Sequence, residues 1–163
     1  MAKGPQPGDP APDFELDGTD GPFHLADHRG ERVVLLFYPG DETMVCTKQF
    51  CSYRDRSDEM AQLDATVVGI SAQDLDSHRS FIEHHGLTVP LLADPDVAVA
   101  RAYGVTRPWQ AGRGLLPKLG AGTSRAVFIV DEEGVVRYRH DDTMDITFQD
   151  VDALRDALAS VGH

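Results

Sequence analysis

The sequence is organised around one stretch, Phe37-Tyr38-Pro39-Gly40-Asp41-Glu42-Thr43-Met44-Val45-Cys46-Thr47-Lys48-Gln49-Phe50-Cys51. The apolar run 33–38 is typical of a strand that is buried on both faces of a sheet. Pro39 and Gly40 indicate a turn, and residues 41–43 are of the types found in turns and at helix N-caps. The stretch therefore predicts a strand, a polar turn and a helix that carries both cysteines of the chain.

Cys46 is the candidate nucleophile, because it is expected in the first turn of that helix. The unpaired N–H groups and the positive end of the helix dipole favour a thiolate over a thiol at such a position. The thiolate is the form of cysteine that attacks electrophiles. From position alone, a buried structural cysteine is an equally good interpretation.

Cys51 follows Cys46 by five residues, and this spacing limits how the two can react. On an intact helix, a rise of ~1.5 Å and a rotation of ~100° per residue put their Cα atoms roughly 8–9 Å apart. A disulfide requires Cα atoms within ~7 Å, so the pair can bond only if the first turns unwind. The spacing allows a redox switch between a folded thiol form and a locally unfolded disulfide form.

Composition argues against several classes of protein. A chain of 163 residues predicts one domain, spanning 1–163. The formal charge of −12, from 15 basic and 27 acidic residues, argues against a nucleic-acid partner or an anionic membrane surface. No stretch has the length or hydropathy of a membrane span, and the first residues lack the apolar core of a signal peptide. Two cysteines without an export signal predict a reducing compartment, the cytoplasm.

The other elements are predicted from apolar periodicity and turn residues. Strands are expected at 13–16, 22–25, 33–38, 66–71, 89–92, 125–131 and 135–140, and helices from Thr43 to about Leu63 and at 75–85, 97–103 and 151–161. Pro90 favours a sheet edge for its segment. Residues 106–124, which include Trp109, predict a long loop. This order indicates an α/β sandwich with a mixed sheet.

The pattern Pro39-x-x-x-Thr43-x-x-Cys46 resembles the active-site motif of the peroxiredoxins. The second cysteine five positions on is similar to the bacterioferritin-comigratory, or Q-type, subfamily of this AhpC/TSA family. Further resemblance lies in three segments: Gly8-Asp9-x-Ala11-Pro12-Asp13-Phe14, Val68-Gly69-Ile70-Ser71 and Arg125-Ala126-Val127-Phe128-Ile129-Val130-Asp131. The resemblance covers nearly the whole chain. It implies a thioredoxin-like fold with a central mixed sheet, helices on both faces and an N-terminal hairpin.

The resemblance also implies a thiol-dependent peroxidase with an atypical two-cysteine mechanism. Cys46 would attack hydrogen peroxide or an organic hydroperoxide and become a sulfenic acid. Cys51 would condense with it to an intramolecular disulfide, which thioredoxin or a similar dithiol would reduce. No metal, flavin or nucleotide cofactor is expected. A monomer is expected over a dimer, because an intramolecular resolving cysteine needs no second subunit.

Three further residues are assigned to the site through the resemblance. Arg125, at the start of a late strand, would reach the first turn of the cysteine helix and stabilise the thiolate; position alone suggests a solvated surface charge. Thr43 and Arg125 would polarise the O–O bond, and Pro39 would shield the sulfur from water.

Two features depart from the pattern of the family. Gln49 stands where many relatives carry a glutamate that braces the arginine, so the arginine is expected to be held differently. Met44-Val45 replaces a Pro-containing pair that is frequent in the subfamily, which affects the expected geometry of the first turn.

Three other interpretations compete with this one. A general thiol–disulfide oxidoreductase would share the fold, but its usual signature is Cys-x-x-Cys. A zinc module could draw on Cys46, Cys51, His84 and His85. Adjacent histidines on a helix project about 100° apart, so these two are expected to be solvated and not to share one ion. A one-cysteine peroxidase, with Cys51 a bystander, is the third.

Overall fold

The computed structural model describes residues 4–106, 122–142 and 147–161. Its elements, in chain order, are β1 (Glu15–Gly18), β2 (Phe23–His24), the 3-10 helix η1 (Leu25–His28), β3 (Val33–Phe37), α1 (Met44–Asp55), α2 (Ser57–Ala61), β4 (Thr66–Ser71), α3 (Leu75–His85), β5 (Leu91–Ala93), α4 (Ala98–Ala102), β6 (Arg125–Val130), β7 (Val136–Asp142) and α6 (Val151–Val161). Trp109 and most of the predicted loop lie outside the described residues.

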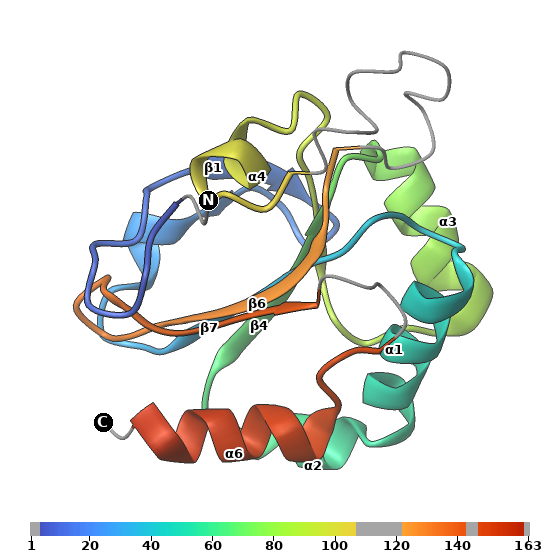
Figure 1. Ribbon diagram of the computed structural model, residues 1–163. Helices are drawn as coiled ribbons and strands as arrows, with labels where there is room; N and C mark the ends of the chain where they lie inside the picture. The colour runs from blue at the N-terminus through green and yellow to red at the C-terminus, as the bar shows by residue number, and fades with distance from the viewer. Residues whose placement is uncertain (1–3, 107–121, 143–146, 162–163) are drawn as a thin grey trace.

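Seven strands form one mixed sheet in the order β2-β1-β5-β4-β3-β6-β7 (Figure 1). The neighbours β3/β4 and β4/β5 are parallel. The pairs β1/β2, β1/β5, β3/β6 and β6/β7 are antiparallel. The predicted mixed sheet and N-terminal hairpin are confirmed, and β3 is the buried central strand that the apolar run 33–38 predicts.

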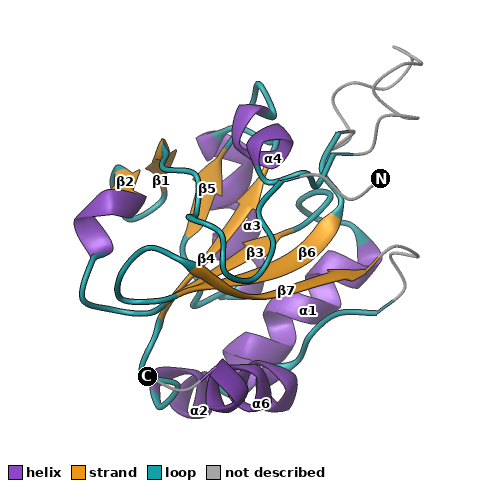
Figure 2. Ribbon diagram, turned by 60° about the vertical axis from the view of Figure 1, so that its left-hand side comes forward, coloured by secondary structure: helices purple, strands orange, loops and turns teal. Residues whose placement is uncertain are grey.

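Helices cover both faces of the sheet because the side chains of β3 alternate between two cores. Val34 and Leu36 face the core that contains the buried residues of α1, α3 and α6. Val33, Leu35 and Phe37 face the core formed with α4 and the N-terminal segment. Figures 1 and 2 show α1, α3 and α6 on one side of the sheet and α4 on the other. None of the helices described is long and apolar enough to cross a membrane.

Gly69 lets α1 lie close to the sheet. A Cβ atom on this residue of β4 would stand 3.0 Å from Cζ of Phe50 and 2.8 Å from Cδ2 of Leu91. Both distances are shorter than ordinary van der Waals contact, so the missing side chain gives the ring of Phe50 its place against β4. This contact sets the distance between α1, which carries both cysteines, and the sheet.

The prediction of one long helix from Thr43 to about Leu63 is wrong, because the helix is interrupted at Arg56. Arg56 has non-helical backbone angles, φ −119° and ψ 39°, and separates α1 from the short α2. Its guanidinium pairs with Glu59 at 2.5 Å and with Asp152 of α6 at 2.7 Å. The break therefore turns α2 toward α6, which apolar periodicity along a single helix could not predict.

The edge position predicted from Pro90 is also wrong. β5 lies inside the sheet, between β1 and β4. Pro90 precedes the strand, where its missing N–H costs no ladder hydrogen bond, and its carbonyl accepts a hydrogen bond from the amide of Gly69.

Candidate functional site

The register of two strands brings Arg125 to the cysteine helix. β6 runs antiparallel to β3, and Ala126 pairs with Phe37, so Arg125 starts β6 beside the point where β3 ends and the turn to α1 begins. Val127 and Ile129 face the core under α1, and Arg125 shares their side of the strand because side chains alternate. An arginine 79 positions from Cys46 thus points at the start of its helix.

Cys46 lies in the first turn of α1 and is fully buried. Arg125 is buried as well, with only 1% of its surface exposed. The Nη2 atom of Arg125 donates a hydrogen bond to Sγ of Cys46 over 2.9 Å. Cys51 lies further along the same helix, partly exposed, and both cysteines are free thiols. The expectation that an intact helix keeps the two unbonded is confirmed. A buried cation on a sulfur at a helix N-terminus is an arrangement suited to a nucleophilic thiolate.

Gln49 braces the arginine, as a glutamate is expected to do in relatives. Its Oε1 atom accepts a hydrogen bond from Nη1 of Arg125. Its Nε2 atom donates to the hydroxyl of Tyr53 over 2.9 Å, and that hydroxyl donates to the carbonyl of Gln149 over 2.5 Å. Gln49 therefore holds the arginine through a neutral amide, which does not neutralise the guanidinium as a glutamate carboxylate would.

Thr43 and Pro39 flank the turn before the helix. Thr43 occupies the N-cap position, as predicted, but its side chain makes no capping hydrogen bond. Its hydroxyl donates instead to the carbonyl of Gly40 over 3.1 Å, which leaves the oxygen lone pairs free to accept. Pro39 is buried, whereas Met44 in the first helical position is 75% exposed.

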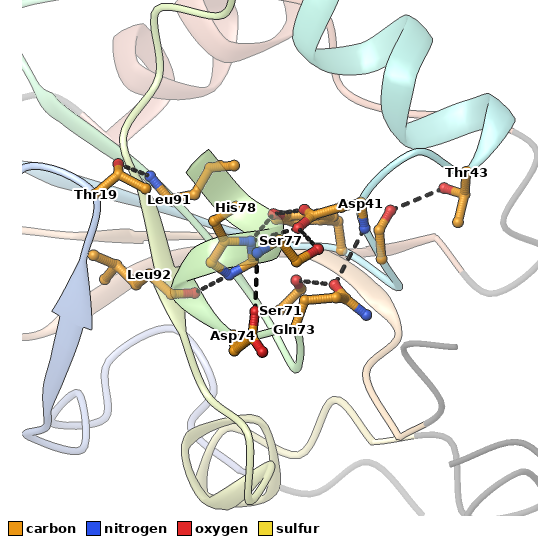
Figure 3. A network of polar contacts seen from close by, with 12 residues as sticks. Thr19, Asp41, Thr43, Ser71, Gln73, Asp74, Ser77, His78, Leu91 and Leu92 are labelled. Atoms are coloured by element: carbon orange, nitrogen blue, oxygen red, sulfur yellow. Dashed lines mark hydrogen bonds and ion pairs between the residues drawn. The ribbon is translucent and has the colours of Figure 1, made fainter. Parts of the chain in front are cut away.

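A buried polar network anchors this turn to α3, and the sequence reasoning missed it (Figure 3). The side chain of Asp41 is only 2% exposed. Its carboxylate accepts hydrogen bonds from Tyr38 at 2.7 Å and Ser77 at 2.8 Å, and contacts Nδ1 of His78 at 2.7 Å. Burial and the neighbouring carboxylate raise the pKa of Tyr38 well above its ordinary value, so this hydroxyl remains a donor. The amide of Asp41 is held by Gln73.

His78 links Asp41 to the sheet. Its side chain is fully buried, and its Nε2 atom lies 3.0 Å from the carbonyl of Leu92 in β5. A carbonyl can only accept, so Nε2 is the donor in this contact, and Nδ1 faces the Asp41 carboxylate. His78 precedes the buried Phe81 by three residues, a spacing that places both on the apolar face of α3. That spacing could have indicated that His78 is buried, but it could not identify Asp41 as its partner.

His84 and His85 do not diverge as helical geometry predicts. Both contact Glu42, through His84 Nδ1 at 2.9 Å and His85 Nε2 at 2.8 Å, and their ring centroids lie 4.3 Å apart. The expected exposure to solvent is confirmed for His84, whose side chain is 68% exposed, whereas that of His85 is 21% exposed. Among the residues described, the group Glu42, His84 and His85 includes neither cysteine, so the combined cysteine–histidine zinc site has no support.

Comparisons with known proteins bear on the family and the fold of the chain. The profile of the AhpC/TSA family matches residues 7–139. The chain is 38% identical over 128 residues to peroxiredoxin Bcp of Bacillus subtilis, which covers 78% of this chain and 79% of the relative. The crystal structure of peroxidoxin BcpB from Mycobacterium tuberculosis aligns with a TM-score of 0.76 at 34% identity over 96% of each chain. Peroxiredoxin Q of Xanthomonas campestris aligns with a TM-score of 0.70 at 27% identity over 91% of this chain and 89% of its own. The thioredoxin-like fold is thereby confirmed.

Replacing Asp41 with asparagine tests the buried network. The substitution keeps the shape but removes the charge that His78, Tyr38 and Ser77 surround, and we expect the free energy of unfolding to fall by about 3 kcal/mol. Denaturant unfolding monitored by circular dichroism measures it. The matched control is Asp13→Asn, because Asp13 contacts His24 over 2.8 Å with 49% of its side chain exposed. A much smaller loss is expected there, and equal losses in the two variants would contradict the role of Asp41.

Proposed function

The chain belongs to the AhpC/TSA family and is a thiol-dependent peroxidase of the peroxiredoxin type, and we propose that Cys46 is its peroxidatic cysteine and Cys51 its resolving cysteine. The observation that carries the assignment of Cys46 is the 2.9 Å contact between its buried sulfur and the buried guanidinium of Arg125. The substrates are hydrogen peroxide and organic hydroperoxides.

In the first step, the Cys46 thiolate attacks the terminal oxygen of the peroxide. An S–O bond forms as the O–O bond breaks in line with it. The transferred oxygen keeps its hydrogen, and the departing alkoxide or hydroxide takes a proton from solvent and leaves as alcohol or water. Cys46 becomes a sulfenic acid. Arg125 and the backbone amide of Cys46 stabilise the negative charge that develops on the oxygens. The hydroxyl of Thr43, which already donates to Gly40, can accept the peroxide O–H and orient it.

Pro39 contributes by exclusion. It is buried in the turn that precedes the helix and has no N–H with which to bind water. A turn without that donor keeps solvent away from the sulfur, which strengthens the hydrogen bonds made to the reacting oxygens.

In the second step, Cys51 attacks the sulfenic sulfur, a disulfide forms and water leaves. This step requires the first turn of α1 to unwind, because the helix holds the two Cα atoms too far apart. The absence of a side-chain cap on Thr43 and the exposure of Met44 support unwinding at this end.

The disulfide is then reduced by thioredoxin or a similar dithiol, which returns both thiols and is itself oxidised. None of these steps uses a metal, a flavin or a nucleotide. Because the two cysteines belong to one chain, a monomer can complete the cycle. A dithiol pool is maintained in a reducing compartment, so we expect the reaction to take place in the cytoplasm.

The first test is peroxide consumption coupled to thioredoxin, thioredoxin reductase and NADPH. We expect turnover in the wild type and none in Cys46→Ser, because the serine hydroxyl is not ionised at neutral pH. Equal background rates in the two proteins would reject the proposal if a single-turnover thiol assay also shows no oxidation of Cys46. Oxidation without turnover would show instead that the reductant is wrong.

Arg125→Lys tests the contact with the sulfur. A lysine has one nitrogen in place of the two with which the guanidinium contacts Cys46 and Gln49, so we expect kcat/KM for peroxide to fall by about 100-fold. The rate of Cys46 alkylation should also decrease near neutral pH. Arg137→Lys is the control, since Arg137 lies on the adjacent strand β7 and pairs with Asp131 at the surface. If Arg125→Lys keeps the wild-type kcat/KM, the arginine has no role in the attack.

Cys51→Ser separates the two-cysteine mechanism from the one-cysteine alternative. We expect the sulfenic acid to form on Cys46 at the wild-type rate in a single turnover, and turnover with thioredoxin to be lost. A mass spectrum after one equivalent of peroxide should show the intramolecular disulfide only in the wild type. Full thioredoxin-dependent turnover of Cys51→Ser would instead make Cys51 a bystander.

A further inference from the structure

Three side chains with metal-binding atoms converge at the surface beside the start of α1. Nδ1 of His84 lies 2.9 Å from Oε2 of Glu42, and Nε2 of His85 lies 2.8 Å from Oε1. One ligand atom from each residue lies within 4.8 Å of the other two. The mechanism proposed above uses none of these residues.

The backbone and the packing hold this group together. Glu42 has φ +61°, a left-handed conformation that non-glycine residues rarely adopt. The two histidines end α3, and Gly86 closes the helix with φ +62°. The ring of His85 packs edge-on against Phe81, with centroids 5.4 Å apart, which orients its Nε2 atom toward Glu42.

We propose that Glu42, His84 and His85 form a binding site for a divalent transition-metal ion of the zinc class. Two imidazole nitrogens and one carboxylate are a common ligand set for Zn²⁺, with water in the open position. In tetrahedral coordination, bond lengths of about 2.0–2.1 Å place neighbouring ligand atoms roughly 3.3 Å apart. The two contacts with Glu42, at 2.9 and 2.8 Å, therefore need to lengthen only slightly.

The charges beside the site are mixed. Glu42 is a carboxylate and the C-terminal end of α3 carries the negative end of its dipole, whereas the guanidinium of Arg54 donates a hydrogen bond to the carbonyl of His85 over 2.6 Å. When the metal binds, each ring nitrogen that faces Glu42 must present a lone pair. The proton that it shares with the carboxylate moves to the other ring nitrogen or to solvent.

The site links the metal to the peroxidatic helix. Glu42 lies next to Thr43 and four residues before Cys46, and the two histidines belong to α3. A bound metal therefore ties the turn before α1 to the end of α3 and opposes unwinding of the first turn. A slower second step of the cycle follows from this, and that consequence alone rests on the proposed function.

Calorimetric titration of Zn²⁺ into the untagged full-length chain carrying Cys46→Ser and Cys51→Ser tests the site without interference from thiolates. We expect one Zn²⁺ per chain. Adding His84→Gln or Glu42→Gln should weaken binding by about tenfold or more. His24→Gln is the matched control, because His24 also contacts a carboxylate at 2.8 Å but has no second histidine beside it. Circular dichroism verifies that each variant is folded. The absence of binding, or binding that His84→Gln and Glu42→Gln leave unchanged, would overturn the site.

Hydrogen exchange of the same cysteine-free protein tests the link to α1. We expect Zn²⁺ to slow exchange of the amides at 43–47, and to have no such effect once His84→Gln is added. Unchanged exchange with metal bound would overturn the link and leave only a surface site. Neither experiment needs peroxidase activity, so a failure here is distinct from a failure of the proposed mechanism.

Discussion

The hydrogen bond from the guanidinium of Arg125 to the sulfur of Cys46 imposes conditions on much of the molecule. Both groups are almost completely removed from water, and a buried arginine is stable only where its N–H groups find partners. Cys46 and Gln49, one turn apart on α1, supply two of these partners. The guanidinium can reach both partners only with α1 in its observed position above the sheet and β6 in its observed register with β3. A slip of one residue would turn Arg125 to the opposite face.

The turn between β3 and α1 is the second element that must be held, and α3 holds it from two sides. Asp41 turns inward to His78 and Ser77 in the first half of α3. Glu42 turns outward to the histidines at the end of the same helix. Two successive carboxylates can point in such different directions because Glu42 has a left-handed backbone. The turn thus has one buried anchor and one exposed anchor.

Helix α1 must hold Cys46 in a fixed position and yet release it during the proposed cycle. Its later turns are held firmly, whereas its first turn is held weakly. Its later turns are fixed, because Phe50 packs against Gly69 and the hydroxyl of Tyr53 donates to Gln149. Its first turn begins without a side-chain cap and with an exposed methionine. Local opening at a helix end costs far less than global unfolding. A cysteine held in the first turn can therefore be buried in one state and released in another while the fold persists.

The sequence alone determined the order of the elements, because apolar periodicity, turn residues and caps are local signals. The helix expected at 75–85 is α3, which Asp74 caps and Gly86 ends. The sequence also indicated the proposed nucleophile and its motif residues, since Pro39, Thr43 and Cys46 lie within eight positions. The sequence could not predict features that depend on contacts with distant parts of the chain. The break at Arg56 depends on α6, the interior place of β5 depends on β1, and the role of His78 depends on Asp41. These contacts join residues far apart in the chain, and no local pattern encodes the distances that only packing of the whole fold sets.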